Sequence, residues 1–190
     1  MKTLIVSSSL DPDSRSEELA QRAHARLLRS GESTFISLKS FSLSGRDLHQ
    51  PQASSVYRNL HTRVAQADGL VLASPVYNWS CCAELKRFVE IVGTTPPDGS
   101  VKGAFFDKVV AFINAAGAPQ SYMSFSSLAT SMMLDFKCVI SPYHVYVTNR
   151  DWNGSILSDR AVARLEKSMD VFLELSTLLK ARSYRSEWEI

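Results

Sequence analysis

Three short stretches of the chain carry the polar and aromatic residues that could bind a ligand. The first is rich in serine: Ser7, Ser8, Ser9, Ser14 and Ser16 follow the first apolar segment. Their hydroxyls and the free N–H groups of a helix start would together form a cradle for an anion such as phosphate. The alternative is that these serines only cap a helix and shape a turn. The sequence contains neither G-x-x-x-x-G-K-[ST] nor G-x-G-x-x-G, which argues against a nucleoside-triphosphate loop and against the dinucleotide fingerprint.

The other two stretches also follow apolar runs. Ser74 to Ser80 reads Ser-Pro-Val-Tyr-Asn-Trp-Ser and comes directly after Gly69 to Ala73, so we expect a buried strand that stops at Ser-Pro and opens into a loop. Asn114 to Pro119 follows Val109 to Ile113 in the same way. Open α/β sheets bind their ligands just beyond the carboxyl ends of the strands. We therefore expect all three stretches to lie at one edge of a sheet.

The segments around these stretches alternate between strand and helix patterns. Short apolar or alternating runs predict strands over residues 2–7, 34–38, 69–74 and 109–113, and over 138–140 and 145–147 on either side of Pro142. Apolar residues at three- and four-residue steps predict helices over 19–28, 56–67 (capped by Ser54 or Ser55), 83–92, from about 121 to 136, and 157–179. Gly31 is the expected C-cap of the first helix, and residues 40–54 and 93–103 are expected to be loops. Five strands alternating with five helices imply a parallel sheet covered on both faces, whose order periodicity leaves open between the flavodoxin and Rossmann arrangements.

Length and composition limit the class of protein. With 190 residues and 45% hydrophobic content, we expect one domain over residues 1–182 and a mobile tail over 183–190. The chain has 21 Lys and Arg and 19 Asp and Glu, and its basic residues form no run. This argues against nucleic acid as a partner. The longest apolar run has five residues, far below the ~20 of a membrane span, so no membrane association and a cytoplasmic location are expected. Three cysteines, two of them adjacent, and four scattered histidines predict no disulfide framework, no metal site and no catalytic dyad.

Taken together, the three stretches resemble the motifs of a known family. The residues Ser8-Ser9-Leu10-x-x-x-Ser14-x-Ser16, Ser74-Pro75-Val76-Tyr77-Asn78-Trp79-Ser80 and Ala115-Ala116-Gly117 resemble, in the same order, those of the NADPH-dependent FMN reductases. The resemblance implies an α/β fold of flavodoxin type, a three-layer sandwich with a five-stranded parallel sheet. In that family the first motif binds the FMN phosphate, the second lies against the isoalloxazine ring, and the third contributes backbone contacts to the ring.

Transferred to this sequence, the resemblance implies a set of cofactor-binding residues. They are Ser8, Ser9, Ser14, Arg15 and Ser16 for the phosphate, Pro75, Val76, Tyr77, Asn78, Trp79 and Ser80 for the ring, and Ala115, Ala116 and Gly117 at the flavin edge. Asp11 stands where the family has an arginine, and Arg15 is expected to supply a cation instead. Cys81 and Cys82 at a helix start, where the helix dipole lowers a thiol pKa, are expected mainly to pack, with redox chemistry as the alternative.

The function implied by the resemblance is electron transfer in two half-reactions. Hydride would pass from NAD(P)H to bound FMN, and electrons would then reach a small-molecule acceptor such as a quinone, an azo compound or free flavin. The family also implies a homodimer or homotetramer with Tyr122 and Met123 near a shared site. Two alternatives stay open: a flavodoxin-type electron carrier without NAD(P)H turnover, and a non-redox α/β protein that binds another phosphorylated ligand.

Overall fold

A single parallel sheet forms the centre of the molecule. The computed structural model describes residues 1–43, 54–94 and 103–186. The strands lie in the order β2 (Glu32–Ser37), β1 (Lys2–Ser7), β3 (Gly69–Tyr77) and β5 (Val109–Ala116). Two short strands, β6 (Val139–Ile140) and β7 (Val145–Thr148), both pair in parallel with β5 and share the fifth position. This is the flavodoxin order and not the Rossmann order, which decides between the two arrangements that periodicity left open.

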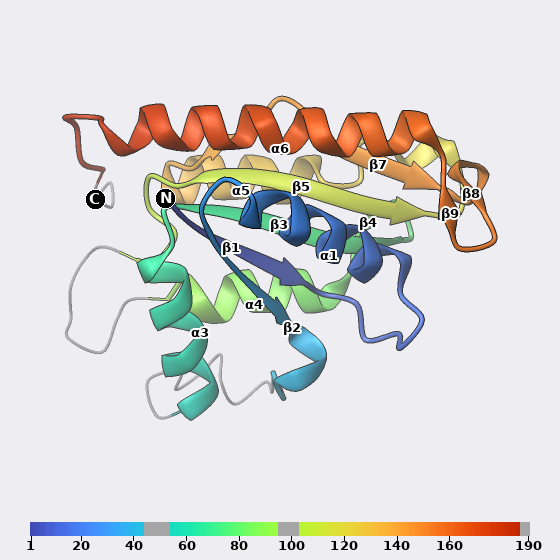
Figure 1. Cartoon of the computed structure of the whole chain (residues 1–190). Coiled ribbons are helices and arrows are strands. Elements are labelled where there is room, and N and C mark those ends of the chain that lie inside the picture. The colour runs from blue at the N-terminus through green and yellow to red at the C-terminus, as the bar shows by residue number, and fades with distance from the viewer. Residues whose placement is uncertain (44–53, 95–102, 187–190) are drawn as a thin grey trace.

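Helices cover both faces of the sheet. Helices α1 (Arg15–Leu28) and α6 (Asp159–Lys180) pack on one face, while α3 (Ser55–Gln66), α4 (Ala83–Val92) and α5 (Ser126–Phe136) pack on the other (Figure 1). The central strands therefore bury both of their faces. In β3, for example, Leu70 and Leu72 face the α3–α4–α5 side and Val71 and Ala73 face the α1–α6 side. Such two-sided burial is the reason these strands read as continuous apolar runs rather than as an alternation.

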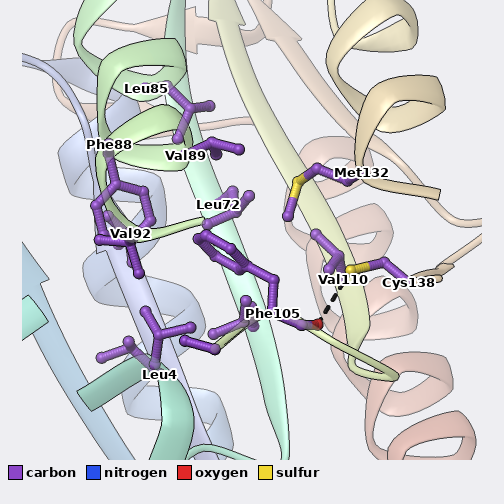
Figure 2. Packing of buried hydrophobic residues seen from close by; sticks show 14 of the residues in the cluster. Leu4, Leu72, Leu85, Phe88, Val89, Val92, Phe105, Val110, Met132 and Cys138 are labelled. Carbon is purple, nitrogen blue, oxygen red and sulfur yellow. Dashed lines mark hydrogen bonds between the residues drawn. The ribbon is translucent and has the colours of Figure 1, made fainter. Parts of the chain in front are cut away.

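The packing is tight on both sides of β3. On the α3–α4–α5 side, the rings of Phe88 and Phe105 meet edge to face at 5.8 Å, and the Cys138 thiol donates to the Phe105 carbonyl at 3.4 Å (Figure 2). On the other side, α6 passes so close to the start of β3 that a Cβ at Gly69 would lie 2.8 Å from the Phe172 ring. Glycine at position 69 is what allows this approach.

The carboxyl ends of the strands define one edge of the molecule. The arrowheads of β1, β5 and β7 point toward this edge, where the short hairpin β8 (Trp152–Asn153) and β9 (Ile156–Leu157) also lies, and the N-terminus lies at the opposite edge (Figure 1). No helix within the described ranges combines the length and apolar character that crossing a bilayer requires. The prediction of one domain over residues 1–182 stays a prediction.

The second stretch differs from its predicted structure. Strand β3 does not stop at Ser74-Pro75 but continues to Tyr77, turns at Asn78-Trp79 and returns as β4 (Ser80–Cys81), antiparallel to its end. Proline is tolerated because β1 pairs with β3 only as far as Ala73, so the missing N–H of Pro75 leaves no bond unmade on that side. Both turn residues have positive φ, 48° and 66°, as in the tight turns that join antiparallel strands.

Three further local predictions were wrong. The first helix ends at Leu28 with Arg29 as its cap, so Gly31 is not the C-cap but sits where a Cβ would approach the Met1 carbonyl at 3.1 Å. The helix expected from 121 begins only at Ser126, after the short 3₁₀ turn η3 (Pro119–Ser121). Leu157 belongs to β9 and not to the last helix, although it packs in the same core.

The tail predicted over residues 183–190 stays a prediction. Within its described part, the Ser186 N–H donates to the buried Asp107 carboxylate, which also pairs with Arg182. The remainder of the predicted tail, and most of the two predicted loops at 40–54 and 93–103, lie outside the described residues.

Candidate functional site

A cavity of about 230 Å³ opens at the carboxyl edge of the sheet. Four segments that are distant in the sequence supply its walls: the loop after β1, the end of β3, the end of β5 and the turn after β7. The lining residues are Ser9, Asp11, Asp13, Ser14, Arg15, Ser16, Pro75, Tyr77, Ala115, Ala116 and Asn149. The predicted phosphate-binding and ring-binding halves thus share one cavity.

The serine loop presents hydroxyls around the start of α1. Ser14 is the N-cap residue, and its Oγ accepts from the Glu17 N–H at 3.1 Å and lies 2.9 Å from the Ser16 Oγ. The first-turn N–H groups of Arg15 and Ser16 have no acceptor within the helix, so they remain available to an anion. Ser8 behaves differently: its hydroxyl donates to the Ala73 carbonyl at 2.8 Å and accepts from the Cys82 thiol, so it faces the core and does not line the cavity.

A part-buried polar network holds this loop in place. The Glu17 carboxylate accepts from the hydroxyls of Ser7 and Ser37 and pairs with Lys39 at 3.0 Å. Burial alone would raise the pKa of Glu17, but the hydrogen bonds from Ser37, Lys39 and Ser7 outweigh it and lower that pKa. Lys39 also donates to the Asp11 carbonyl at 3.0 Å. Strand β2 and its following turn η1 (Leu38–Ser40) therefore anchor the loop that lines the cavity.

Two charged residues of the loop, Asp11 and Arg15, are held by contacts of their own. The Asp11 carboxylate accepts from the Asp13 N–H at 2.9 Å, which folds the loop on itself. Arg15 reaches across the cavity edge and donates to the Asn149 side-chain carbonyl at 2.7 Å, while its guanidinium lies 5.3 Å from the centre of the Trp152 ring. Arg15 thus ties the start of α1 to the turn η4 (Asn149–Asp151).

The β3–β4 hairpin forms the aromatic side of the cavity. Pro75 is buried in its wall, whereas Tyr77 has 56% of its surface exposed and offers a free ring face. Ser74 fixes the base of the hairpin, since its hydroxyl donates to the Pro75 carbonyl at 2.8 Å and accepts from the Cys82 N–H at 3.0 Å. The hairpin tip carries Asn78, Trp79 and Ser80 away from the cavity, and Val76 does not line it either.

The end of β5 supplies the floor. Ala115 and Ala116 line the cavity, and Gly117 follows outside it, beside the Asn149 side chain. One residue earlier, the buried Asn114 accepts from His144 Nε2 at 2.9 Å and donates to the Ser74 carbonyl at 3.4 Å. A polar link therefore runs from β7 through β5 to the base of the hairpin.

The adjacent cysteines show no sign of an activated thiol. Burial raises the pKa of Cys81 to about 11, opposite to the lowering expected at a helix start. Cys82 is the N-cap residue of α4, and its thiol donates to Ser8 within the core. The raised pKa of Cys81 and the buried contacts of the Cys82 thiol agree with the packing role and give no support to redox chemistry at these thiols.

Comparison with protein families identifies the chain. Residues 1–153 match the model of the NADPH-dependent FMN reductase family. The chain belongs to this family. The match includes all three predicted motifs and ends just beyond Asn149, so every segment that lines the cavity falls within it.

Solved structures of similar fold include enzymes and a carrier. An apo NADH:FMN oxidoreductase, EMOB, superposes with a TM-score of 0.75 at 17% identity, over 98% of this chain and 94% of its own. FerB, an NAD(P)H:(acceptor) oxidoreductase from Paracoccus denitrificans, gives 0.71 at 20% identity over 94% and 98%. A Streptococcus pneumoniae TIGR4 flavodoxin gives 0.60 at 12% over 92% and 99%. At these identities the likeness shows the fold alone, and no match was found among curated proteins.

Family membership and geometry together show what sequence reasoning missed. Asn149 and Asp13 line the cavity but were not among the predicted site residues. Asn149 carried a usable signal, because it follows the strand predicted over 145–147 and so had to lie at the carboxyl edge. Asp13 carried none, since nothing in the sequence tells which loop carboxylates face a cavity.

Proposed function

We propose that this chain is an FMN-dependent oxidoreductase that uses NAD(P)H to reduce a small-molecule acceptor. The observation that carries the proposal is the cavity itself, which joins the serine loop to the β3–β4 hairpin and the end of β5. Bound FMN would supply the chemistry, accepting hydride from NAD(P)H and passing electrons on. The chain's own residues would bind and orient it.

The phosphate half of the cavity suits a dianion. Ser9, Ser14 and Ser16 offer hydroxyls, and the start of α1 adds unpaired N–H groups and the positive end of the helix dipole. Arg15 adds a cation whose position is fixed by Asn149 and Trp152. The carboxylates of Asp11 and Asp13 would repel a phosphate, but one Asp11 carboxylate oxygen accepts a hydrogen bond from the loop backbone. We assign phosphate binding to the serines and Arg15.

The ring half suits a flat aromatic group. Tyr77 and Pro75 present apolar surface on one side, and the backbone at Ala115 and Ala116 lies on the other. Backbone amides near a flavin edge stabilise the negative charge that develops there on reduction. Because the exposed Tyr77 ring leaves the cavity open, nicotinamide and a second substrate could use the same face in turn, which suits quinones, azo compounds or free flavin.

A second copy of the chain would complete this site. Large apolar side chains of the β3–β4 hairpin and of the segment after η3 are exposed, among them Trp79 at 68%, Met123 at 60% and Tyr77 at 56%. The Cys81 N–H donates to the Ser124 carbonyl at 3.2 Å, which holds β4 beside the segment that carries Tyr122 and Met123. Exposed apolar patches on a protein surface often mark an interface. We propose a homodimer, or a tetramer built from it, with a cytoplasmic location where NAD(P)H is available.

The test is the visible spectrum of the purified protein, chromatography of any released flavin, and steady-state oxidation of NADPH with a quinone. The proposal expects FMN and turnover that depends on it. Bound FMN without NAD(P)H oxidation would instead identify an electron carrier. A colourless protein that takes up no added FMN would identify a non-redox phosphate-ligand protein.

A further inference from the structure

A second cavity, of about 300 Å³, lies beside β7 and shares no lining residue with the first. Three rings line it: Tyr122 from the segment after η3, His144 just before β7, and Tyr146 within β7. Arg160 and Arg164 of α6 and Asp151 of η4 supply charge. Its volume is at the lower end of the roughly 300–1,000 Å³ of small-ligand pockets, so it suits a molecule with a single ring.

The rings form a fixed aromatic wall. The Tyr122 ring centre lies 5.1 Å from that of His144 and 5.4 Å from that of Tyr146. Tyr146 is held through its hydroxyl, which lies 2.8 Å from the Ser121 Oγ and donates to the Ala118 carbonyl. Tyr122 itself is half-exposed, so part of its ring is free to meet a ligand.

His144 forms an uncharged part of the cavity wall. Its Nε2 donates to the Asn114 side-chain carbonyl, an oxygen that can only accept, so its proton lies on Nε2. Its Nδ1 is enclosed by neighbouring atoms. Burial, and secondarily Arg164, lower the pKa of His144 to about 4, so the ring is neutral near pH 7 and adds no charge to the lining.

The charges at this cavity favour an anion. Arg164 uses its Nε to donate to the His144 carbonyl at 3.0 Å, a bond that does not involve its two terminal amino groups. Arg160 is exposed at the rim. The opposing Asp151 carboxylate accepts from both the N–H and the hydroxyl of Thr148, at 2.8 and 2.9 Å. Two guanidinium groups against one carboxylate leave a net positive lining, in the planar form that pairs with carboxylates.

We propose that this second cavity binds a small aromatic acid. The aromatic ring would lie against Tyr122, and its carboxylate would pair with Arg160 and Arg164. The site does not depend on the proposed flavin site. The two cavities share one wall, since η4 places Asn149 in the first and Asp151 in the second.

The test is calorimetric titration of the purified protein with benzoate, with phenol and inorganic sulfate as comparison probes. We expect benzoate to bind more tightly than phenol, and sulfate to show no measurable binding. Arg160→Gln should weaken binding roughly tenfold, the usual cost of a lost charged hydrogen bond. The matched control is Lys167→Gln, which removes a cation from the same helix outside the cavity and should change nothing.

Four outcomes would overturn the proposal: no binding of benzoate, sulfate binding as tight as the aromatic acid, equal losses in the Arg160 and Lys167 variants, or displacement of the acid by added FMN. The last would place the acid in the first cavity. Tyr122 is exposed, so Tyr122→Ala should leave the fold intact, and this second variant should also weaken binding. Because the titration needs no flavin, a protein that binds no FMN leaves this result readable on its own.

Discussion

Replacing Ser14 with alanine separates a structural role from a binding role. In the folded chain the Ser14 hydroxyl caps α1 by accepting from the Glu17 N–H at 3.1 Å. Loss of an N-cap side chain costs about 1 kcal/mol of unfolding free energy. If the same hydroxyl also binds phosphate, Ser14→Ala should in addition weaken FMN binding by about 1 kcal/mol, which is about fivefold in Kd.

The matched control is Ser54→Ala. Ser54 caps α3 in the same manner, its Oγ accepting from the Tyr57 N–H at 3.3 Å, but it does not line the cavity. Urea unfolding of the flavin-free proteins should show similar losses of stability for both variants. Titration followed by flavin fluorescence should show a weaker Kd for Ser14→Ala alone. If FMN affinity is the same in both variants, Ser14 is only a helix cap and the phosphate assignment fails.

Three other predictions follow from the same geometry. Tyr77→Ala should lower NAD(P)H-dependent turnover or FMN affinity with little change in thermal unfolding, because the ring is exposed; normal flavin binding and turnover would remove Tyr77 from the site. The free energy of unfolding should fall by about 2 kcal/mol between pH 7.5 and 5 because of His144, whose pKa is lowered from 6.5 to about 4, so that the unfolded chain takes up the proton first. His144→Gln should remove this loss, and identical pH profiles of urea unfolding in the two proteins would contradict it. Trp79→Ser should shift sedimentation equilibrium toward the monomer, whereas an unchanged mass would show that the hairpin tip lies outside any interface.

Much of the sheet could be predicted because its central strands are buried on both faces. Runs such as Leu70 to Ala73 need no partner to be recognised, and together with the alternating edge strand β2 and the helical patterns between them they imply the layered fold. The strand order could not be predicted from these runs, because the order β2-β1-β3-β5 and the Rossmann order use strands of the same apolar character. Only the pairing itself, or the family resemblance, decides between them.

Two of the wrong boundaries share a physical cause, which is a contact with a distant segment. Ser74-Pro75 is a local turn signal, yet β5 pairs with both residues, and β4 pairs with Val76 and Tyr77 beyond them. The helix expected from 121 starts late, after backbone turns in which the Ser124 N–H bonds to Ser121 and the Ser124 carbonyl accepts from Cys81 of the hairpin. Neither contact leaves a trace in the local sequence.

For the site, too, the positions of the strand ends could be predicted, whereas the directions of single side chains could not. Strand ends brought Ser9, Ser14, Ser16, Pro75, Tyr77, Ala115 and Ala116 to one cavity, because the carboxyl ends of parallel strands meet at one edge. Within each stretch, however, side-chain direction is set by neighbours that the motif does not contain. Ser8 turns inward because the Ala73 carbonyl and the Cys82 thiol are there to meet it, and Asn78 to Ser80 turn outward with the hairpin.

The phosphate half of the cavity depends on how its charges are restrained rather than on how many there are. Asp11, in the place of the family's arginine, would oppose a phosphate if its carboxylate were free, but one oxygen accepts from the Asp13 N–H. Arg15 could neutralise a phosphate only from where Asn149 holds it, at 2.7 Å. Asn149 therefore decides whether the cation faces the cavity or solvent, and it comes from the opposite side of the sheet edge. The proposed anion site would in that sense be built from two loops, of which the serine motif is one.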